Sequence, residues 1–141
     1  MIVLLSIFPI FLWTFIHPQG HKLLRNPANY IAILVLTLAL LIASATSFEC
    51  NLKAFEKRNI LAPISLLAFL FLYKLCDKLC IKKYGRHMFF SVRYNSVWQD
   101  GESDESTFFE SILQMLLIFA PLLVWQGLSW LILQCIDKYN C

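Results

Sequence analysis

Hydrophobic residues fall into four blocks along the chain, and three polar intervals separate them. The blocks cover about residues 2–16, 28–48, 60–76 and 110–134. Within each block the apolar residues follow one another instead of recurring at amphipathic spacing, which is typical of helices surrounded by lipid. We therefore predict an all-α integral membrane protein, in which a bundle of four transmembrane helices forms a single domain over residues 1–141.

The first block is short for a membrane span. Fifteen residues at 1.5 Å each give roughly 22 Å, against a hydrocarbon core of about 30 Å. Pro9 lies inside the block and removes one helix hydrogen bond. Two outcomes follow: the segment spans a locally thinned bilayer, or it lies partly in the interface. Neither Lys nor Arg precedes the block and no small-residue cleavage site follows it, so we expect it to be retained.

The second block is the clearest span, about 20 residues without a charge. Asn26 followed by Pro27 suits a helix start. Small residues recur along this block at steps of three, four and seven and would form one stripe, which lets a neighbouring helix approach closely. The stripe contains Ala28, Ala32, Ala39, Ala43 and Thr46. We predict helix packing through Ala32, Ala39 and Ala43, and through the amides of Gln114 and Gln126 in the fourth block.

Local signals give the ends of the other helices. We predict polar loops over residues 21–25 and 49–59, with Asn59 as N-cap of a third helix that continues to Tyr84 and ends at Gly85. Thr107 and Glu110 have the spacing of a capping box at the start of the fourth helix. In that helix Pro121 predicts a bend near the middle.

Composition agrees with membrane embedding. Hydrophobic residues make up 59% of the chain and charged residues 15%, and the mean hydropathy is +0.65. This exceeds the apolar content that a soluble domain of 141 residues buries. The net charge is only +3, with the basic residues beside the predicted spans, so we expect lipid headgroups rather than nucleic acid as the anionic partner.

The distribution of Lys and Arg predicts the orientation. Four spans place the first and third polar intervals on one side, and both termini with the second interval on the other. The first side holds Lys22, Arg25, Lys74, Lys78, Lys82, Lys83, Arg86 and Arg93, and the second holds Lys53, Lys57, Arg58 and Lys138. By the positive-inside rule the interval over residues 77–107 is cytoplasmic and the termini lie outside. The predicted location is a multi-pass cell membrane protein, in the bacterial inner membrane.

The interval over residues 77–107 changes character along its length. A basic part is followed by an aromatic stretch from Met88 to Trp98, which we expect to lie at the membrane surface, and then by an acidic run that stands away from anionic lipid. An alternative for the aromatic stretch is a strand added to the sheet edge of a partner. The predicted contacts with lipid or a partner are Arg86, Phe89, Phe90, Arg93, Tyr94, Trp98, Asp100, Glu102, Asp104 and Glu105.

The sequence gives little support for catalysis or metal binding. Cys76 and Cys80 share one helix face and His87 follows, but a zinc site needs further ligands. No nucleophile elbow, phosphate-binding glycine loop or metalloprotease motif is present. We therefore predict a protein that is not an enzyme and has no metal and no cofactor. The cores of the predicted spans hold no charge of the kind that marks an ion pathway.

Two functions are compatible with this pattern. The first is a non-enzymatic membrane subunit that docks a soluble cytoplasmic protein through residues 77–107 and associates with other membrane subunits or with itself, as in bacterial defence, immunity or secretion assemblies. The alternative is an oligomeric pore or membrane-perturbing effector. On the predicted outer side, a disulfide from Cys50 to Cys135 or to Cys141 is compatible with an oxidising compartment.

Overall fold

The computed structural model is all-helical within the residues it describes, which are 1–11, 20–47, 52–88 and 108–138. No strand occurs among them. In chain order the helices are α1 (Ile2–Phe11), α2 (Gly20–Arg25), α3 (Pro27–Thr46), α4 (Ala54–Ile60), α5 (Pro63–Tyr84) and α6 (Phe108–Lys138). The predicted all-α class is confirmed for these parts of the chain.

Three of the described helical stretches are long and apolar enough to cross a membrane: Pro27–Thr46, Ala54–Tyr84 and Phe108–Ile136. The predicted span over residues 2–16 is not confirmed, so the bundle of four transmembrane helices is not confirmed either. The described part of the first block is the 10-residue helix α1, which is about 15 Å long and so reaches half way across a hydrocarbon core. Residues 12–16 of that predicted span lie outside the described residues.

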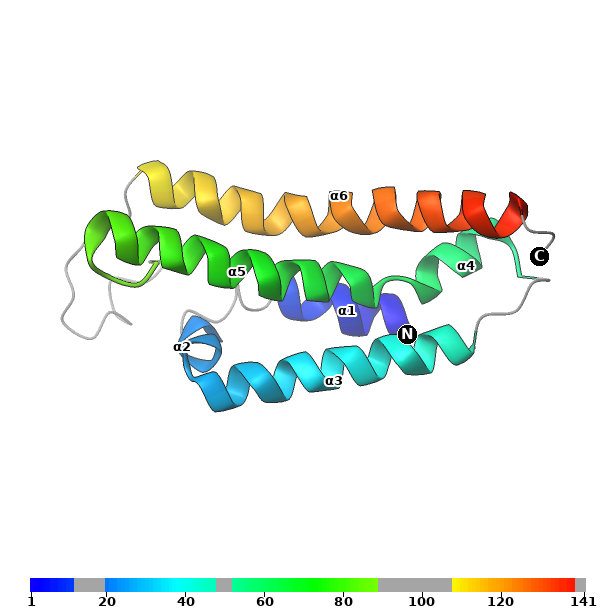
Figure 1. The fold of residues 1–141 in the computed structure, drawn as a ribbon, viewed down its shortest axis with the longest axis horizontal. Coiled ribbons are helices and arrows are strands. Elements are labelled where there is room, and N and C mark those ends of the chain that lie inside the picture. The colour runs from blue at the N-terminus through cyan, green and yellow to red at the C-terminus, as the bar shows by residue number, and fades with distance from the viewer. Residues whose placement is uncertain (12–19, 48–51, 89–107, 139–141) are drawn as a thin grey trace.

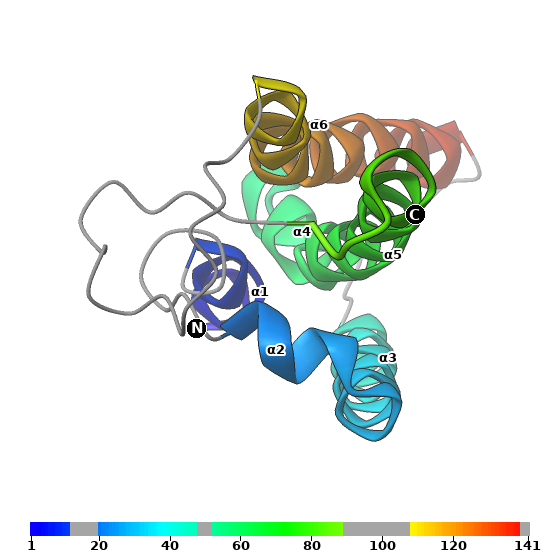
Figure 2. The ribbon, with the colours of Figure 1, turned by 90° about the vertical axis from the view of Figure 1, so that its left-hand side faces the viewer.

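The three long helices run side by side, with α5 between α3 and α6 (Figure 1). α3 and α6 start at the end of the bundle where α5 finishes, so α5 is antiparallel to both. α1 packs beside the first half of α5 and beside α4. An end-on view places α6, α1 and α3 around α5 in that order (Figure 2).

The two ends of the bundle differ in charge. The end formed by α2, the finish of α5 and the start of α6 is called the basic end, because it carries most of the described cations. They are Lys22, Arg25, Lys74, Lys78, Lys82, Lys83 and Arg86. The opposite end is formed by the finish of α3, by α4 and by the finish of α6, and carries Lys53, Lys57, Arg58 and Lys138.

Several predicted helix ends are confirmed. Pro27 opens α3, and the Asn26 side chain accepts a hydrogen bond from the Ala28 amide at 3.0 Å. α5 ends at Tyr84, and Gly85 has a φ of 70°, the left-handed conformation that suits glycine at this position. α6 continues through Pro121. Thr107 of the predicted capping box lies outside the described residues.

Three local predictions are wrong. Residues 21–25 belong to α2, and the predicted loop over residues 49–59 contains α4. Asn59 is therefore inside a helix instead of capping one. α4 starts within the predicted loop because the Glu56 carboxylate accepts a hydrogen bond from the Lys53 N–H at 3.1 Å. Pro63 has no N–H to bond the Asn59 carbonyl, so the helix stops and a new one starts at Pro63.

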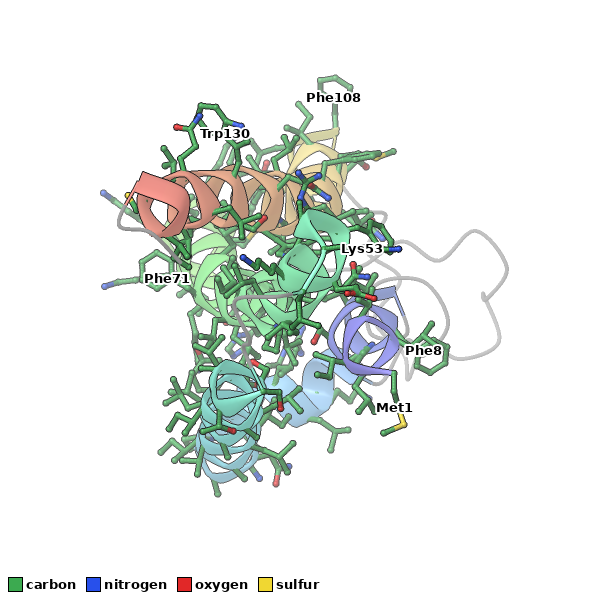
Figure 3. All side chains as sticks on the ribbon, turned by 90° about the vertical axis from the view of Figure 1, so that its right-hand side faces the viewer. Met1, Phe8, Lys53, Phe71, Phe108 and Trp130 are labelled. Carbon is green, nitrogen blue, oxygen red and sulfur yellow. The ribbon has the colours of Figure 1, made fainter. Side chains whose placement is uncertain are left out.

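The core lies along α5, where α1, α2, α3 and α6 meet it. Phe69, Leu70 and Tyr73 are buried there, with Leu117 from α6. Large apolar side chains elsewhere point outward, as Phe8, Phe71 and Trp130 do in Figure 3. An apolar outer surface of this extent is what a bilayer covers. The structure thus supports a membrane-embedded helical protein.

Candidate functional site

The buried face of α5 contains one acidic residue, Asp77. Along this helix the buried positions recur at steps of three and four, which is the period of one helix face. They include Leu66, Phe69, Leu70, Tyr73, Cys76, Asp77 and Cys80. The Asp77 side chain is only 10% exposed. A carboxylate in such a place requires hydrogen-bond donors, because an unpaired buried charge is strongly unfavourable.

The donors come from the residues just after α5. His87 Nδ1 lies 2.9 Å from Asp77 Oδ2 and 3.2 Å from Oδ1. Since a carboxylate only accepts, this nitrogen carries the proton. The backbone N–H of Met88 donates to Asp77 Oδ1 at 3.0 Å. The left-handed turn at Gly85 reverses the chain so that these donors reach back to the helix.

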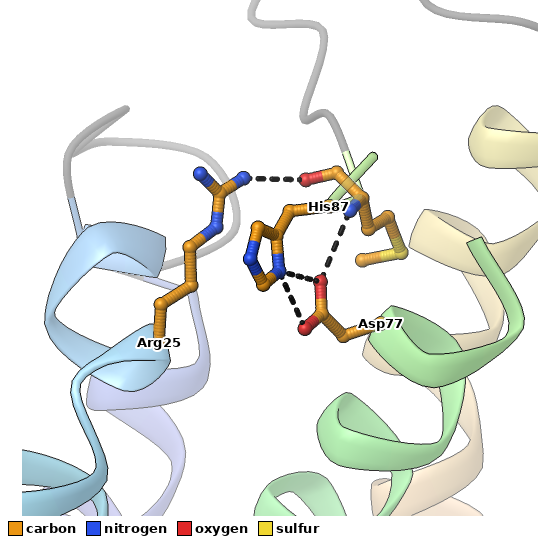
Figure 4. A network of polar contacts seen from close by, with 4 residues as sticks. Arg25, Asp77 and His87 are labelled. Atoms are coloured by element: carbon orange, nitrogen blue, oxygen red, sulfur yellow. Dashed lines mark hydrogen bonds and ion pairs between the residues drawn. The ribbon is translucent and has the colours of Figure 1, made fainter. Parts of the chain in front are cut away.

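A cation from α2 completes the arrangement (Figure 4). Arg25 Nη2 donates to the Met88 carbonyl at 3.0 Å, and Arg25 also interacts with the hydroxyl of Tyr73. Both polar groups of the Met88 backbone are thus bound, one by α5 and one by α2. We call the set Arg25, Asp77, His87 and Met88 the Asp77 clasp. It fixes the backbone at Met88, the last described residue before the interval over residues 89–107.

An ion pair lies near the start of α6. Arg86 Nη2 is 3.2 Å from Glu110 Oε2. The Glu110 side chain is fully buried, while that of Arg86 is 29% exposed. Glu110 is in the first turn of α6, where a negative charge also interacts favourably with the helix dipole. Both ends of the interval over residues 89–107 are therefore joined to the same end of the bundle.

At the opposite end, Arg58 of α4 contacts two uncharged side chains of α6. The indole Nε1–H of Trp125 donates to the Arg58 carbonyl at 3.1 Å. Arg58 Nη1 donates to Gln126 Oε1 at 3.4 Å, on an exposed surface. These two contacts connect α4 to α6.

The thiols of the basic end lie in the core rather than in a reactive setting. Cys76 and Cys80 are buried and free, and Cys135 is exposed and free. In the described part of the chain, no three side chains of the types that bind metals come together. Cys50 and Cys141 lie outside it, so the disulfide alternatives stay predictions.

Of the predicted contact residues, the structure describes only Arg86, which it pairs with Glu110. Phe89, Phe90, Arg93, Tyr94, Trp98, Asp100, Glu102, Asp104 and Glu105 lie outside the described residues. The predicted helix-packing residues are mostly on the outside. Ala32, Ala39 and Ala43 are exposed, because α3 meets the core through Tyr30, Ile33 and Leu34 instead. Gln114 is half-buried, and Gln126 is exposed.

Sequence reasoning missed the roles of Arg25, Asp77, His87 and Glu110. The sequence predicts a capping role for Glu110 and identifies no partner for Asp77. A signal was available, because both acids fall on an apolar stripe of their own helix. On α6 the buried positions Glu110, Leu113, Leu117, Pro121 and Trp125 recur at steps of three and four.

The function of this chain is inferred from the geometry of the residues described above. No family model, curated protein or solved structure matches this chain. The Asp77 carboxylate, His87 Nδ1, Arg25 Nη2 and both backbone polar groups of Met88 make hydrogen bonds that hold parts of the chain together. The arrangement can therefore position a segment.

Proposed function

We propose that this chain is a non-enzymatic membrane anchor that presents residues 89–107 at one face of the bilayer, where they dock a soluble protein. The Asp77 clasp is the observation that carries this proposal. It binds both the N–H and the carbonyl of Met88, at 3.0 Å each, at the point where the interval begins. The Arg86–Glu110 pair lies at the point where the interval ends.

In this proposal, docking is favoured by holding both ends of the interval over residues 89–107 in place. A segment tethered at both ends has fewer conformations to lose when a partner binds, so the free energy of ordering it is smaller. Burying two carboxylates is costly unless each is well paired. The use of such pairs at the base of one interval, in a chain with few charges, supports a role in which the placement of that interval matters.

The proposed orientation places the basic end in the cytoplasm, because Lys and Arg near spans are retained on that side. We place the protein in a bacterial inner membrane, where residues 89–107 face soluble cytoplasmic partners. In this arrangement the acidic residues contact the partner. They are Asp100, Glu102, Asp104 and Glu105.

Charge reversal tests the proposal. The partner of the wild-type chain is first identified by cross-linking in intact cells. The variant Asp100→Lys, Glu102→Lys, Asp104→Lys and Glu105→Lys is then expected to lose that partner, while its amount in the membrane stays unchanged. Lys53→Glu is the control, since it reverses a charge that is exposed at the opposite end, and it should retain the partner.

Two results would contradict docking through this interval. One is recovery of the same partner at wild-type yield by the fourfold reversal. The other is loss of the membrane potential on expression with no cross-linked soluble protein, which would favour the pore alternative. Gln114→Ala and Gln126→Ala would then be expected to change the conductance.

A further inference from the structure

The outward face of α5 carries two parallel rows of side chains. Residues four apart on a helix lie one above the other, and two such series run along this face. The α5 lysine row is Lys74, Lys78 and Lys82, and all three are exposed. The α5 apolar row is Phe71, Leu75 and Leu79, which are 67%, 46% and 41% exposed.

This face is open between two helices. α3 packs against one side of α5 and α6 against the other (Figure 2). Phe71 projects outward from α5 between them in Figure 3. Lys74 Nζ lies 4.6 Å from the centroid of the Tyr30 ring of α3, so the lysine row is on the α3 side. On the α6 side, Lys83 Nζ lies 3.8 Å from the centroid of the Phe109 ring.

These contacts also give the depth of the face relative to the bilayer. α3 is 20 residues long, which matches a hydrocarbon core of about 30 Å. Tyr30 is in its first turn, at the level where tyrosine rings prefer the membrane interface. Lys74, which lies over that ring, is therefore at the interface. Lys78 and Lys82 extend from there toward the aqueous side.

We propose that the outward face of α5 binds an anionic phospholipid, with its headgroup phosphate on the α5 lysine row and an acyl chain that passes Phe71 of the α5 apolar row toward the bilayer interior. Charge complementarity provides the attraction, and cation–π contacts hold Lys74 and Lys83 in place before the lipid arrives. This inference depends on membrane embedding and is independent of docking through residues 89–107.

The pairing of the two rows selects a lipid over other anionic occupants. A soluble acidic protein or a nucleic acid would neutralise the lysine row but leave the adjacent apolar row uncovered. A second copy in a symmetric dimer would place each lysine row against the apolar row of the other copy, where the ammonium groups would be buried without an anion. A phospholipid contacts both rows at once, because its charge and its hydrocarbon are joined in one molecule.

The test uses the full chain reconstituted in vesicles of equal parts phosphatidylcholine and phosphatidylglycerol. Spin-labelled lipid of each headgroup reports the fraction held at the protein surface. The wild type is expected to select phosphatidylglycerol. Lys78→Gln should reduce this selectivity about fivefold. Replacing each further lysine of the row should reduce it by a similar factor, until the two lipids bind equally well.

Matched variants separate this site from general attraction to positive charge. The triple variant Lys74→Arg, Lys78→Arg and Lys82→Arg keeps the charge and should keep the selectivity. Lys53→Gln removes one exposed cation at the opposite end and should leave the selectivity unchanged. Circular dichroism checks that each variant stays helical.

The proposal is overturned by equal binding of the two lipids to the wild type. It is also overturned if the triple glutamine variant, Lys74→Gln, Lys78→Gln and Lys82→Gln, remains helical and retains the full selectivity for phosphatidylglycerol. If the triple glutamine variant lost binding to a soluble polyanion such as heparin but kept the lipid selectivity of the wild type, the lysine row would be assigned to a soluble partner instead.

Discussion

At the basic end a buried carboxylate accepts hydrogen bonds from His87 and from the Met88 backbone, whereas at the opposite end neutral groups of Trp125 and Gln126 hold Arg58. Removing one member of a buried ionic set leaves charges and donors without partners. Removing the uncharged Gln126 side chain at an exposed position allows water or headgroups to replace it. The basic end should therefore be far more sensitive to substitution than the opposite end.

The largest effect is expected from Asp77→Ala. It removes the acceptor of the Met88 N–H and of His87, so the free energy of unfolding in detergent micelles should fall by about 3 kcal/mol. Asp77→Asn keeps an oxygen that can accept the Met88 N–H and should cost less. A loss for Asp77→Ala no greater than that for a surface variant would contradict the importance of the clasp.

Glu110→Ala should have the next largest effect. The Arg86 side chain is 29% exposed, so its charge can turn toward water, and we expect a cost of about 2 kcal/mol. A double-mutant cycle with Arg86→Ala measures the pair directly and should give a coupling free energy of about 1 kcal/mol. Strict additivity of the two single substitutions would show that the ion pair contributes nothing.

Gly85→Ala tests the turn that brings His87 and Met88 back to Asp77. A Cβ at Gly85 would meet nothing within 4 Å, but φ is +70°. The expected cost is therefore the conformational one, about 1 kcal/mol. Gly127→Ala is the control, because a Cβ there also meets nothing within 4 Å and the backbone is helical. An equal response of the two glycines in thermal unfolding would be inconsistent with this explanation.

The smallest effects belong to the opposite end. Trp125→Phe keeps most of the ring but removes the hydrogen bond to Arg58, which is worth about 1 kcal/mol. Gln126→Ala removes a 3.4 Å contact at an exposed position, and should change the free energy of unfolding by less than about 0.5 kcal/mol. Either variant costing more than Asp77→Ala would reverse the comparison between the two ends.

Much of the fold could be predicted from the sequence because long apolar runs, prolines and glycines act locally. Pro27, Tyr84 and Gly85 are where the sequence places them. Short helices were harder to predict, since α2 and α4 consist largely of polar residues and depend on contacts such as that of Glu56. The length of α1 gives no support for a full fourth span among the described residues.

The clasp could be predicted only in part. Helical periodicity puts Asp77 and Glu110 on buried faces, which identifies two carboxylates that need partners. It does not identify the partners, because Arg25 and Met88 are 63 positions apart in the chain. The meeting of α2 with the end of α5 is a property of the tertiary packing, and no local pattern around Arg25 encodes it.

Hydrogen exchange at the Met88 amide is the most direct test, since that amide donates to a buried carboxylate and immediately precedes the interval that we propose docks a partner. We expect the Met88 amide to be protected from hydrogen exchange in the reconstituted wild type. Protection should remain largely intact in Gln126→Ala and be lost in Asp77→Ala. Rapid exchange of the Met88 amide in the wild type would contradict the account, because residue 88 would then not be held and the interval would have no fixed exit from the bundle.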